Sequence, residues 1–258
     1  MADSMDSPTT KLAYFDDMWQ LKSRASFISM VADGERLAVI VDSTILYPQG
    51  GGQPADIGFI YDLDERLKFR VQDVRSRNGV VFHYGYFDSP LSEQSTFQKG
   101  QEVILSVDEH RRGLNSRLHS AGHLLDVCMH NIGLASLESG KGHHFPDGAF
   151  VEYKGKIPAD DLERKREALE KEAKRLVSIG GKVSAAIVPY ESAAALCGGE
   201  LPEYIPKDTT PRIVMLGDNL GCPCGGTHVA DISDIGIIKV SQIRVRKGLT
   251  KVSYTIGP

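Results

Sequence analysis

The 258-residue sequence has little cysteine, no long apolar run and no excess of positive charge. Its four cysteines are too few and too scattered for a disulfide scaffold, so their thiols remain available for other chemistry. No stretch is long and apolar enough to cross a bilayer. The first ten residues lack the hydrophobic core of a secretory signal and the arginines of a transit peptide. We therefore expect a soluble cytosolic protein that does not enter a membrane.

The net charge of −4 does not favour nucleic-acid binding by the molecule as a whole. Local basic patches are the candidates for RNA contact, and a solvated surface would explain the same residues. The patches comprise Arg111, Arg112 and Arg117 in one stretch and Arg244, Arg246, Lys247 and Lys251 in another.

Residues 1–107 have the pattern of an all-β domain. Short runs rich in Val, Ile, Phe and Tyr alternate with Asp33-Gly34 and Asn78-Gly79, which are strong hairpin signals. Strands are predicted at 25–31, 36–42, 69–74, 80–86 and 102–107. This spacing predicts a small antiparallel barrel.

From Asp108 the hydrophobic period changes to that of a helix. Asp108 can cap the helix, and a charged helix is predicted from Pro158 to about Ile179. Further strands are predicted at 149–153, 183–189, 212–216, 235–242 and 251–256, with a short helix at 191–196. The sequence thus predicts an α+β protein with a barrel domain at 1–107 and an α+β domain at 108–258.

Two histidine-containing pairs with four-residue spacing indicate a metal site. His119 and His123 lie on one face of the predicted helix, and Cys224 and His228 repeat the spacing far downstream. Three imidazoles and one thiolate are a typical donor set for zinc. Cys222 is a weaker candidate for the sulfur ligand because Cys222-Pro-Cys224 is too tight for both sulfurs to bind one ion.

Motifs of known zinc enzymes are absent, and this limits the chemistry. A zinc peptidase needs H-E-x-x-H, but Ser120 occupies the glutamate position, and the H-x-E and C-x-x-C pattern of deaminases is missing. A catalytic ion needs an exchangeable position, for which His228 is the candidate, whereas a structural ion would keep all four ligands. His143 and His144 lack the ligand spacing and are predicted as loop residues.

A glycine-rich segment runs from Thr44 to Gly58 and contains Gly50-Gly51-Gly52-Gln53. Consecutive glycines let the backbone approach a ligand or another segment closely, and Gln53 offers an amide that both donates and accepts hydrogen bonds. No Walker or G-x-G-x-x-G motif is present, so a nucleotide loop is not indicated. A tight turn of the barrel is the alternative interpretation.

Taken together, these motifs resemble the freestanding alanyl-tRNA editing proteins of the AlaX type, in the medium-length form with a glycine-rich barrel. The resemblance rests on Thr44, Tyr47, the Gly50–Gln53 run, Asp56 and Gly58, followed by His119-x-x-x-His123-Leu-Leu and Cys224-Gly-Gly-Thr-His228. It spans nearly the whole chain and includes relatedness to the editing domain of alanyl-tRNA synthetase. Threonyl-tRNA synthetases share the histidine and cysteine pairs, but the glycine-rich segment indicates the alanine group.

The resemblance implies a zinc-dependent deacylase that acts in trans on mischarged tRNA(Ala), chiefly Ser-tRNA(Ala), with Gly-tRNA(Ala) as a further substrate. It implies that His119, His123, Cys224 and His228 hold the ion. It also implies that Thr44, Gly51, Gly52 and Gln53 lie at the aminoacyl pocket, where Gln53 would bond a serine hydroxyl. The alternatives are a noncatalytic zinc-stabilised tRNA-binding module and a zinc hydrolase of a small ester or amide.

Overall fold

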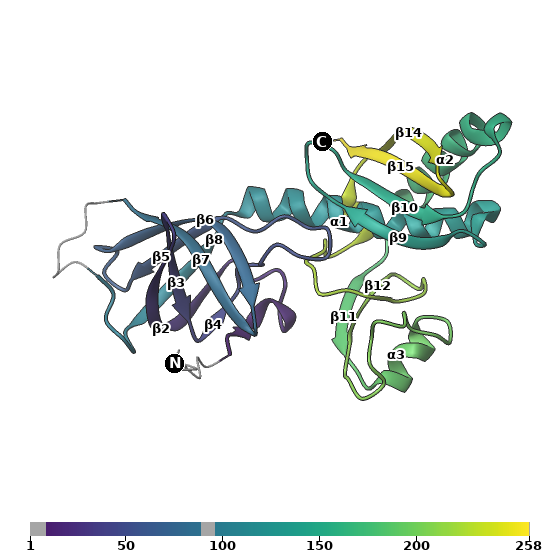
Figure 1. Cartoon of the computed structure of the whole chain (residues 1–258). Helices are drawn as coiled ribbons and strands as arrows, with labels where there is room; N and C mark the ends of the chain where they lie inside the picture. The colour runs from purple at the N-terminus through teal and green to yellow at the C-terminus, as the bar shows by residue number, and fades with distance from the viewer. Residues whose placement is uncertain (1–8, 89–95, 258) are drawn as a thin grey trace. The chain divides into compact units, whose positions relative to one another are not determined.

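The computed structural model describes residues 9–88 and 96–257, which form two compact units (Figure 1). The first unit comprises Met1–Gly50 and Pro54–Arg112, and the second comprises Gly51–Gln53 and Gly113–Pro258. Three residues of the glycine-rich segment therefore belong to the second unit. The boundary that we propose between residues 107 and 108 lies just before this division. Most of the N-terminal stretch considered for targeting lies outside the described residues.

Among the described residues of the first unit, six antiparallel strands close into a barrel in the order β2-β3-β7-β6-β5-β8. The strands are β2 (Lys22–Asp33), β3 (Arg36–Val41), β5 (Gly58–Asp62), β6 (Lys68–Arg77), β7 (Val80–Phe87) and β8 (Glu102–Val107). Short strands β1 (Lys11–Leu12) and β4 (Ser43–Thr44) pair in parallel. At the predicted β6–β7 turn, Asn78 and Gly79 have φ of 50° and 78°, as a two-residue hairpin requires.

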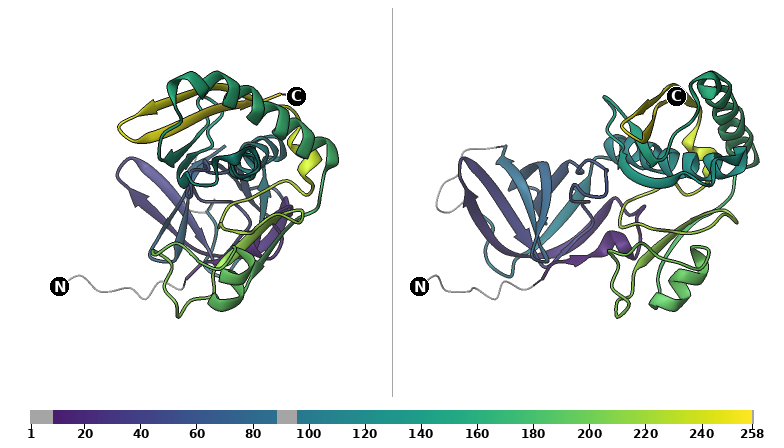
Figure 2. Two further views of the ribbon diagram at one scale, coloured as in Figure 1. Left: turned by 90° about the vertical axis from the view of Figure 1, so that its right-hand side faces the viewer. Right: turned by 45° about the vertical axis from the view of Figure 1, so that its right-hand side comes forward.

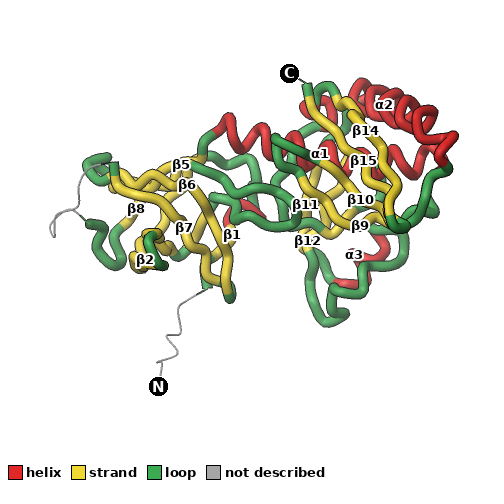
Figure 3. Tube along the Cα trace, turned by 45° about the horizontal axis from the view of Figure 1, so that its top comes forward, coloured by secondary structure: helices red, strands yellow, loops and turns green. Residues whose placement is uncertain are grey.

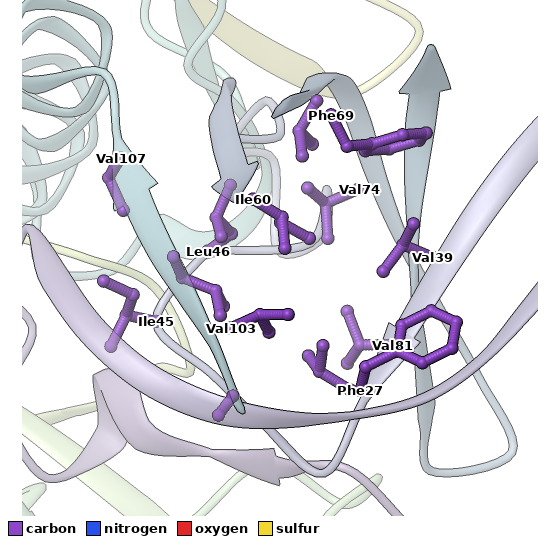
Figure 4. Packing of buried hydrophobic residues seen from close by; sticks show 14 of the residues in the cluster. Phe27, Val39, Ile45, Leu46, Ile60, Phe69, Val74, Val81, Val103 and Val107 are labelled. Carbon is purple, nitrogen blue, oxygen red and sulfur yellow. The ribbon is translucent and has the colours of Figure 1, made fainter. Parts of the chain in front are cut away.

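Alternate residues of the barrel strands point inward and form its core, because successive side chains of a strand lie on opposite faces. Val39, Ile60, Phe69 and Val103 are each fully buried there (Figure 4). This packing explains why runs rich in Val, Ile, Phe and Tyr predicted the barrel.

The second unit is built around helix α1 (Glu109–Met129), whose last seventeen residues belong to it. Its four-stranded sheet has the order β14-β15-β10-β9, and its three-stranded sheet has the order β11-β12-β13 (Figure 3). The strands are β9 (Glu138–His143), β10 (Phe150–Lys154), β11 (Val183–Ile187), β12 (Arg212–Leu216), β13 (Cys222–Pro223), β14 (Ile238–Arg246) and β15 (Leu249–Ile256). Helix α2 (Leu162–Ile179) lies along β14 (Figure 2), and α3 (Tyr190–Leu196) follows β11.

The α+β class and the N-terminal barrel are confirmed. The predicted cap of α1 is present, because the Asp108 carboxylate accepts a hydrogen bond from the Arg111 backbone N–H at 2.7 Å. Strands β5 and β9 were not predicted, and His143 ends β9 instead of lying in a loop. Residues 232–235, part of which was predicted as strand, form a short 3-10 helix.

No helix within the described ranges is both long enough and apolar enough to span a membrane.

Candidate metal centre

Folding brings the four predicted metal ligands together. His119 and His123 project from consecutive turns of α1, and Cys224 and His228 come from the segment that follows β13. One donor atom from each residue lies within 4.8 Å of the other three, so this group could hold a metal ion. The imidazoles of His119 and His228 are buried, whereas His123 and Cys224 are partly exposed.

The separations of the donor atoms fit a tetrahedral ion. The Cys224 sulfur lies 3.5 Å from Nε2 of His119 and 3.4 Å from Nε2 of His228. Zinc bonds of about 2.3 Å to sulfur and 2.0–2.1 Å to nitrogen, at a tetrahedral angle, place those atoms about 3.5 Å apart. Cys224, His119 and His228 are therefore spaced as ligands of such an ion, and the donor atom of His123 lies within 4.8 Å of theirs.

Gln53 fixes the orientation of the His119 ring. Its amide oxygen lies 2.7 Å from His119 Nδ1 and accepts a 2.9 Å hydrogen bond from the Thr227 backbone N–H. Its amide nitrogen donates to the Thr227 hydroxyl at 2.8 Å. Because an amide oxygen only accepts, Nδ1 of His119 must carry the proton. The Nε2 lone pair is thus directed toward the cluster, as a metal ligand requires.

Cys224 and His228, the two cluster residues on the downstream segment, are also oriented by hydrogen bonds from neighbouring groups. The Ser120 hydroxyl lies 3.1 Å from Nδ1 of His228, which leaves Nε2 facing the Cys224 sulfur. The Gly226 backbone N–H donates to that sulfur at 3.3 Å. Arg212 donates to the carbonyls of Cys224 and Gly226 at 2.9 Å each, which stabilises the turn. These contacts preorganise the sulfur and imidazole donors.

Two glycines permit the close packing of this region. A Cβ on Gly226 would lie 2.2 Å from Cε1 of His119 and 2.8 Å from the Gln53 amide oxygen. Gly52 has φ of +79°, and a Cβ there would lie 2.5 Å from the Gly142 carbonyl oxygen. Glycine is therefore required at both positions.

Burial determines the protonation of the cluster. Loss of hydration lowers the pKa of His123 to about 4 and places the pKa values of His119 and His228 well below their usual range. The imidazoles are consequently neutral at neutral pH, which is the form that binds metals. Burial raises the pKa of the Cys224 thiol to about 11, although the Gly226 N–H and the Arg212 charge oppose this shift.

The residues expected at the aminoacyl pocket fall in different units. Gly51, Gly52 and Gln53 belong to the second unit, with Gln53 fully buried. Thr44 belongs to the first unit, where its hydroxyl lies 2.8 Å from Nε2 of His83 and accepts a hydrogen bond from the Leu46 N–H. The pocket assignment remains a prediction.

The basic candidates have different environments. Arg112 is buried in the first unit, where its guanidinium forms an ion pair with Asp56 and donates to the carbonyls of Met18 and Ile45. Arg117 donates to the carbonyls of Ile235 and Gly257. Arg111 is partly exposed, and Arg244, Arg246 and Lys247 are exposed.

Several residues around the cluster were not singled out from the sequence. The His144 ring stacks on His119 with centroids 4.6 Å apart, and its Nδ1 lies 2.6 Å from the Tyr254 hydroxyl. The Ser116 hydroxyl lies 2.8 Å from that of Thr227. Ser116 and Ser120 precede and follow His119 on the predicted helix, and Thr227 lies within the Cys224–His228 motif. Their positions beside His119 and within the Cys224–His228 motif could therefore have indicated Ser116, Ser120 and Thr227, but no such signal marks His144.

Comparisons with known proteins show which proteins the chain is similar to. Residues 3–111 match the family model of class II tRNA synthetases (A). The chain is 29% identical over 95% of its length to the alanyl-tRNA editing protein AlaX-L of Pyrococcus horikoshii, and it spans 57% of that protein. It is also 30% identical over 97% of its length to the alanine–tRNA ligase of Methanosarcina mazei and 29% identical over 98% to that of Methanococcus vannielii. It spans only 26% and 27% of these two ligases, respectively.

These similarities agree with the sequence motifs, the barrel and the clustering of the histidines and the cysteine. The resemblance predicted from the sequence is confirmed, and the chain is similar to the alanyl-tRNA editing proteins of the AlaX type.

Proposed function

We propose that the chain is a zinc-dependent deacylase that hydrolyses the ester of mischarged tRNA(Ala), with Ser-tRNA(Ala) as the chief substrate and Gly-tRNA(Ala) as a further one. The observation that carries this proposal is the convergence of His119, His123, Cys224 and His228, whose donor atoms lie within 4.8 Å of one another. The similarity to the Pyrococcus relative, an alanyl-tRNA editing protein, supports the substrate class. The reaction adds water across the ester and gives the free amino acid and tRNA.

The protein's contribution is to hold and orient the donors. A zinc ion held by these side chains would supply Lewis-acid chemistry for ester hydrolysis, and this role requires one ligand position, for which His228 is the candidate, to be exchangeable. Gln53 and Ser120 orient His119 and His228, and the Gly226 N–H supports the thiolate of Cys224. Because His123 and Cys224 are partly exposed, we propose that the substrate approaches from their side of the cluster.

The selectivity for serine would come from a polar network that lies beside the ligands. A pocket that activates alanine cannot strongly exclude a residue that merely adds a hydroxyl, so a second site must recognise that group. Gln53, Thr227 and Ser116 form a buried hydrogen-bonded chain. We propose that the serine hydroxyl accepts a hydrogen bond from the second N–H of the Gln53 amide, because the amide oxygen already bonds His119 and Thr227 and the first N–H bonds the Thr227 hydroxyl. Leaving a buried polar group without a partner costs about 1–3 kcal/mol, which disfavours alanine.

We propose that RNA is contacted through Arg111 and Arg117 and through the exposed Arg244, Arg246 and Lys247. The affinity should fall as salt rises, because phosphate contacts release counterions. The buried ion pair with Asp56 gives Arg112 a role in stabilising the barrel, and we do not extend the RNA proposal to it.

The test is release of serine from Ser-tRNA(Ala), measured beside Ala-tRNA(Ala). We expect release of serine but not alanine by the native chain, loss of release in Cys224→Ser, and normal release in Cys197→Ser. Cys197 is a matched control because it is partly exposed and lies outside the cluster. Stable binding of tRNA without release would make the protein a noncatalytic RNA-binding module. A Gln53→Ala variant that retained the native preference for serine would refute the assignment of Gln53 to the pocket.

A further inference from the structure

The four-stranded sheet of the second unit has one buried face and one open face. On the buried face, the Tyr153 hydroxyl donates to Asp126 of α1 at 2.7 Å, and the Tyr254 hydroxyl donates to the Leu118 carbonyl of α1 at 2.9 Å. Residues on either side of these tyrosines point the other way, because successive residues of a strand alternate between faces. In Figure 1, α1 passes behind the sheet, and the open face is turned toward the viewer.

The open face carries many more cations than carboxylates. Its basic side chains, from β10, β14, β15 and the β14–β15 turn, are Lys154, Lys239, Arg244, Arg246, Lys247 and Lys251. The acidic side chains near these cations include Glu138, which forms a 2.7 Å ion pair with Lys154, and Glu152, which is opposite Lys251 in the strand register. Glu203 also acts electrostatically on Lys154. The whole chain has a net charge of −4, so this surplus is a local property of the face. It complements a polyanion.

A ladder of three aromatic rings adjoins these cations. The His143 ring stacks on Phe145 with centroids 4.3 Å apart and planes 9° apart, and on Phe150 at 5.1 Å and 28°. The Lys251 ammonium lies 3.4 Å from the centre of the Phe150 ring. All three rings are partly exposed. Parallel rings beside lysine and arginine are the combination that binds unpaired nucleotides, with bases stacking on rings and phosphates meeting cations.

The ladder is directly connected to the metal centre. His143 belongs to the ladder, and the next residue, His144, stacks on the metal-site residue His119 with ring centroids 4.6 Å apart. Consecutive Cα atoms are about 3.8 Å apart. The two features thus lie on opposite sides of the same strand end. An RNA terminus that stacks on the ladder would therefore pass around this strand end to bring its ester to the metal ligands.

We propose that the open face of the β14-β15-β10-β9 sheet binds the unpaired 3′-terminal nucleotides of the RNA substrate. A terminal base stacks on the ladder formed by His143, Phe145 and Phe150, and the adjoining phosphates contact Arg244 and Lys251. This inference rests on the proposed function for the identity of the RNA. It adds an aromatic subsite to the basic residues already considered.

The test is equilibrium binding of the full chain to uncharged tRNA(Ala), with its unpaired 3′ end either intact or removed. Phe145→Leu keeps an apolar side chain but removes the ring, so we expect affinity for the intact RNA to fall by roughly 5- to 100-fold, as for one stacked base. Affinity for the shortened RNA should not change. The matched control is Phe59→Leu in the barrel, where Lys68 and Arg70 lie 4.1 Å and 4.7 Å from the ring centre.

The charged part of the proposal is tested by salt dependence. The double variant Arg244→Gln and Lys251→Gln should reduce the slope of log affinity against log salt by about 1.4, at about 0.7 for each lost contact with a single strand. Measured metal content and circular dichroism establish that each variant is folded. If these measurements show that Phe145→Leu is not folded, RNA binding is measured with His143→Leu instead.

The outcomes separate this inference from the proposed function. Native affinity in the ladder variants, or equal losses on the intact and the shortened RNA, would overturn the inference even if serine release is normal. A loss confined to the intact RNA supports the inference, even if the native chain releases no serine and the proposed function fails.

Discussion

The contact between Gln53 and His119 gives the sharpest prediction about the metal centre. Gln53→Met keeps the volume of the side chain but removes the acceptor for His119 Nδ1–H and for the Thr227 N–H, which it now bonds at 2.7 and 2.9 Å. Loss of a residue that orients a metal-binding histidine typically lowers affinity by about 10- to 100-fold. We expect zinc affinity to fall by that factor, or about 1.4–2.7 kcal/mol.

Stability should fall as well, because both orphaned donors are buried. At about 1–3 kcal/mol for each, the metal-free protein should lose roughly 2–6 kcal/mol of unfolding free energy. Zinc affinity is measured by competition with a chromophoric chelator, and stability by urea denaturation. Gln53→Glu retains an acceptor and should recover most of the zinc affinity, whereas Gln49→Met alters an exposed glutamine and should change neither quantity. Native zinc affinity in Gln53→Met would refute the orienting role.

Three further changes test other parts of the structure. Gly226→Ala places a Cβ 2.2 Å from His119, so zinc affinity should fall at least tenfold, as it does when a residue that orients a ligand is lost. The control Gly225→Ala changes an exposed position and should not alter zinc affinity. Equal affinities of the two variants in a chelator competition would contradict the packing argument. Arg112→Met leaves the buried Asp56 carboxylate unpaired and should lower the free energy of unfolding, measured by urea denaturation, by about 3–5 kcal/mol. Arg24→Met breaks an exposed ion pair with Glu102 and should lower it by less than about 1 kcal/mol. Similar losses in the two variants would show that the buried pair is unimportant. Burial raises the pKa of Asp126 from 3.8 to about 6. Between pH 3.8 and pH 6 the folded state therefore keeps a proton that the unfolded state has released. The free energy of unfolding consequently falls as the pH rises through this range. Asp126→Asn should therefore stabilise the protein by at most about 3 kcal/mol at pH 8 and hardly at pH 4, and a gain that is the same at both pH values would exclude this cause.

The clustering of the four candidate metal ligands could be predicted because its signal is local. Helical periodicity alone places His119 and His123 on one face of α1, and the repeated spacing in Cys224 and His228 indicates a second pair. The barrel was predictable for a similar reason, since runs rich in Val, Ile, Phe and Tyr and the Asp-Gly and Asn-Gly turns are short-range patterns.

Long-range partners determine the features that the sequence did not predict. Arg112 looks like a surface cation until folding places the Asp56 carboxylate beside it. Strand β9 contains Glu-Ser-Gly-Lys-Gly-His, a poor strand sequence, and it forms because it pairs with β10 at the edge of the sheet. His144 lacks ligand spacing, and it reaches the cluster only because β9 ends beside α1, where its ring stacks on His119.

The central claim is that His119, His123, Cys224 and His228 together hold one zinc ion. X-ray absorption at the zinc edge of the purified chain, combined with metal analysis, tests it directly. The structure leads us to expect one zinc per chain, with one sulfur neighbour at about 2.3 Å and nitrogen neighbours at about 2.0–2.1 Å. The sulfur signal should be lost in Cys224→Ser and kept in Cys197→Ser. A protein without zinc, or a spectrum without sulfur, would contradict the account.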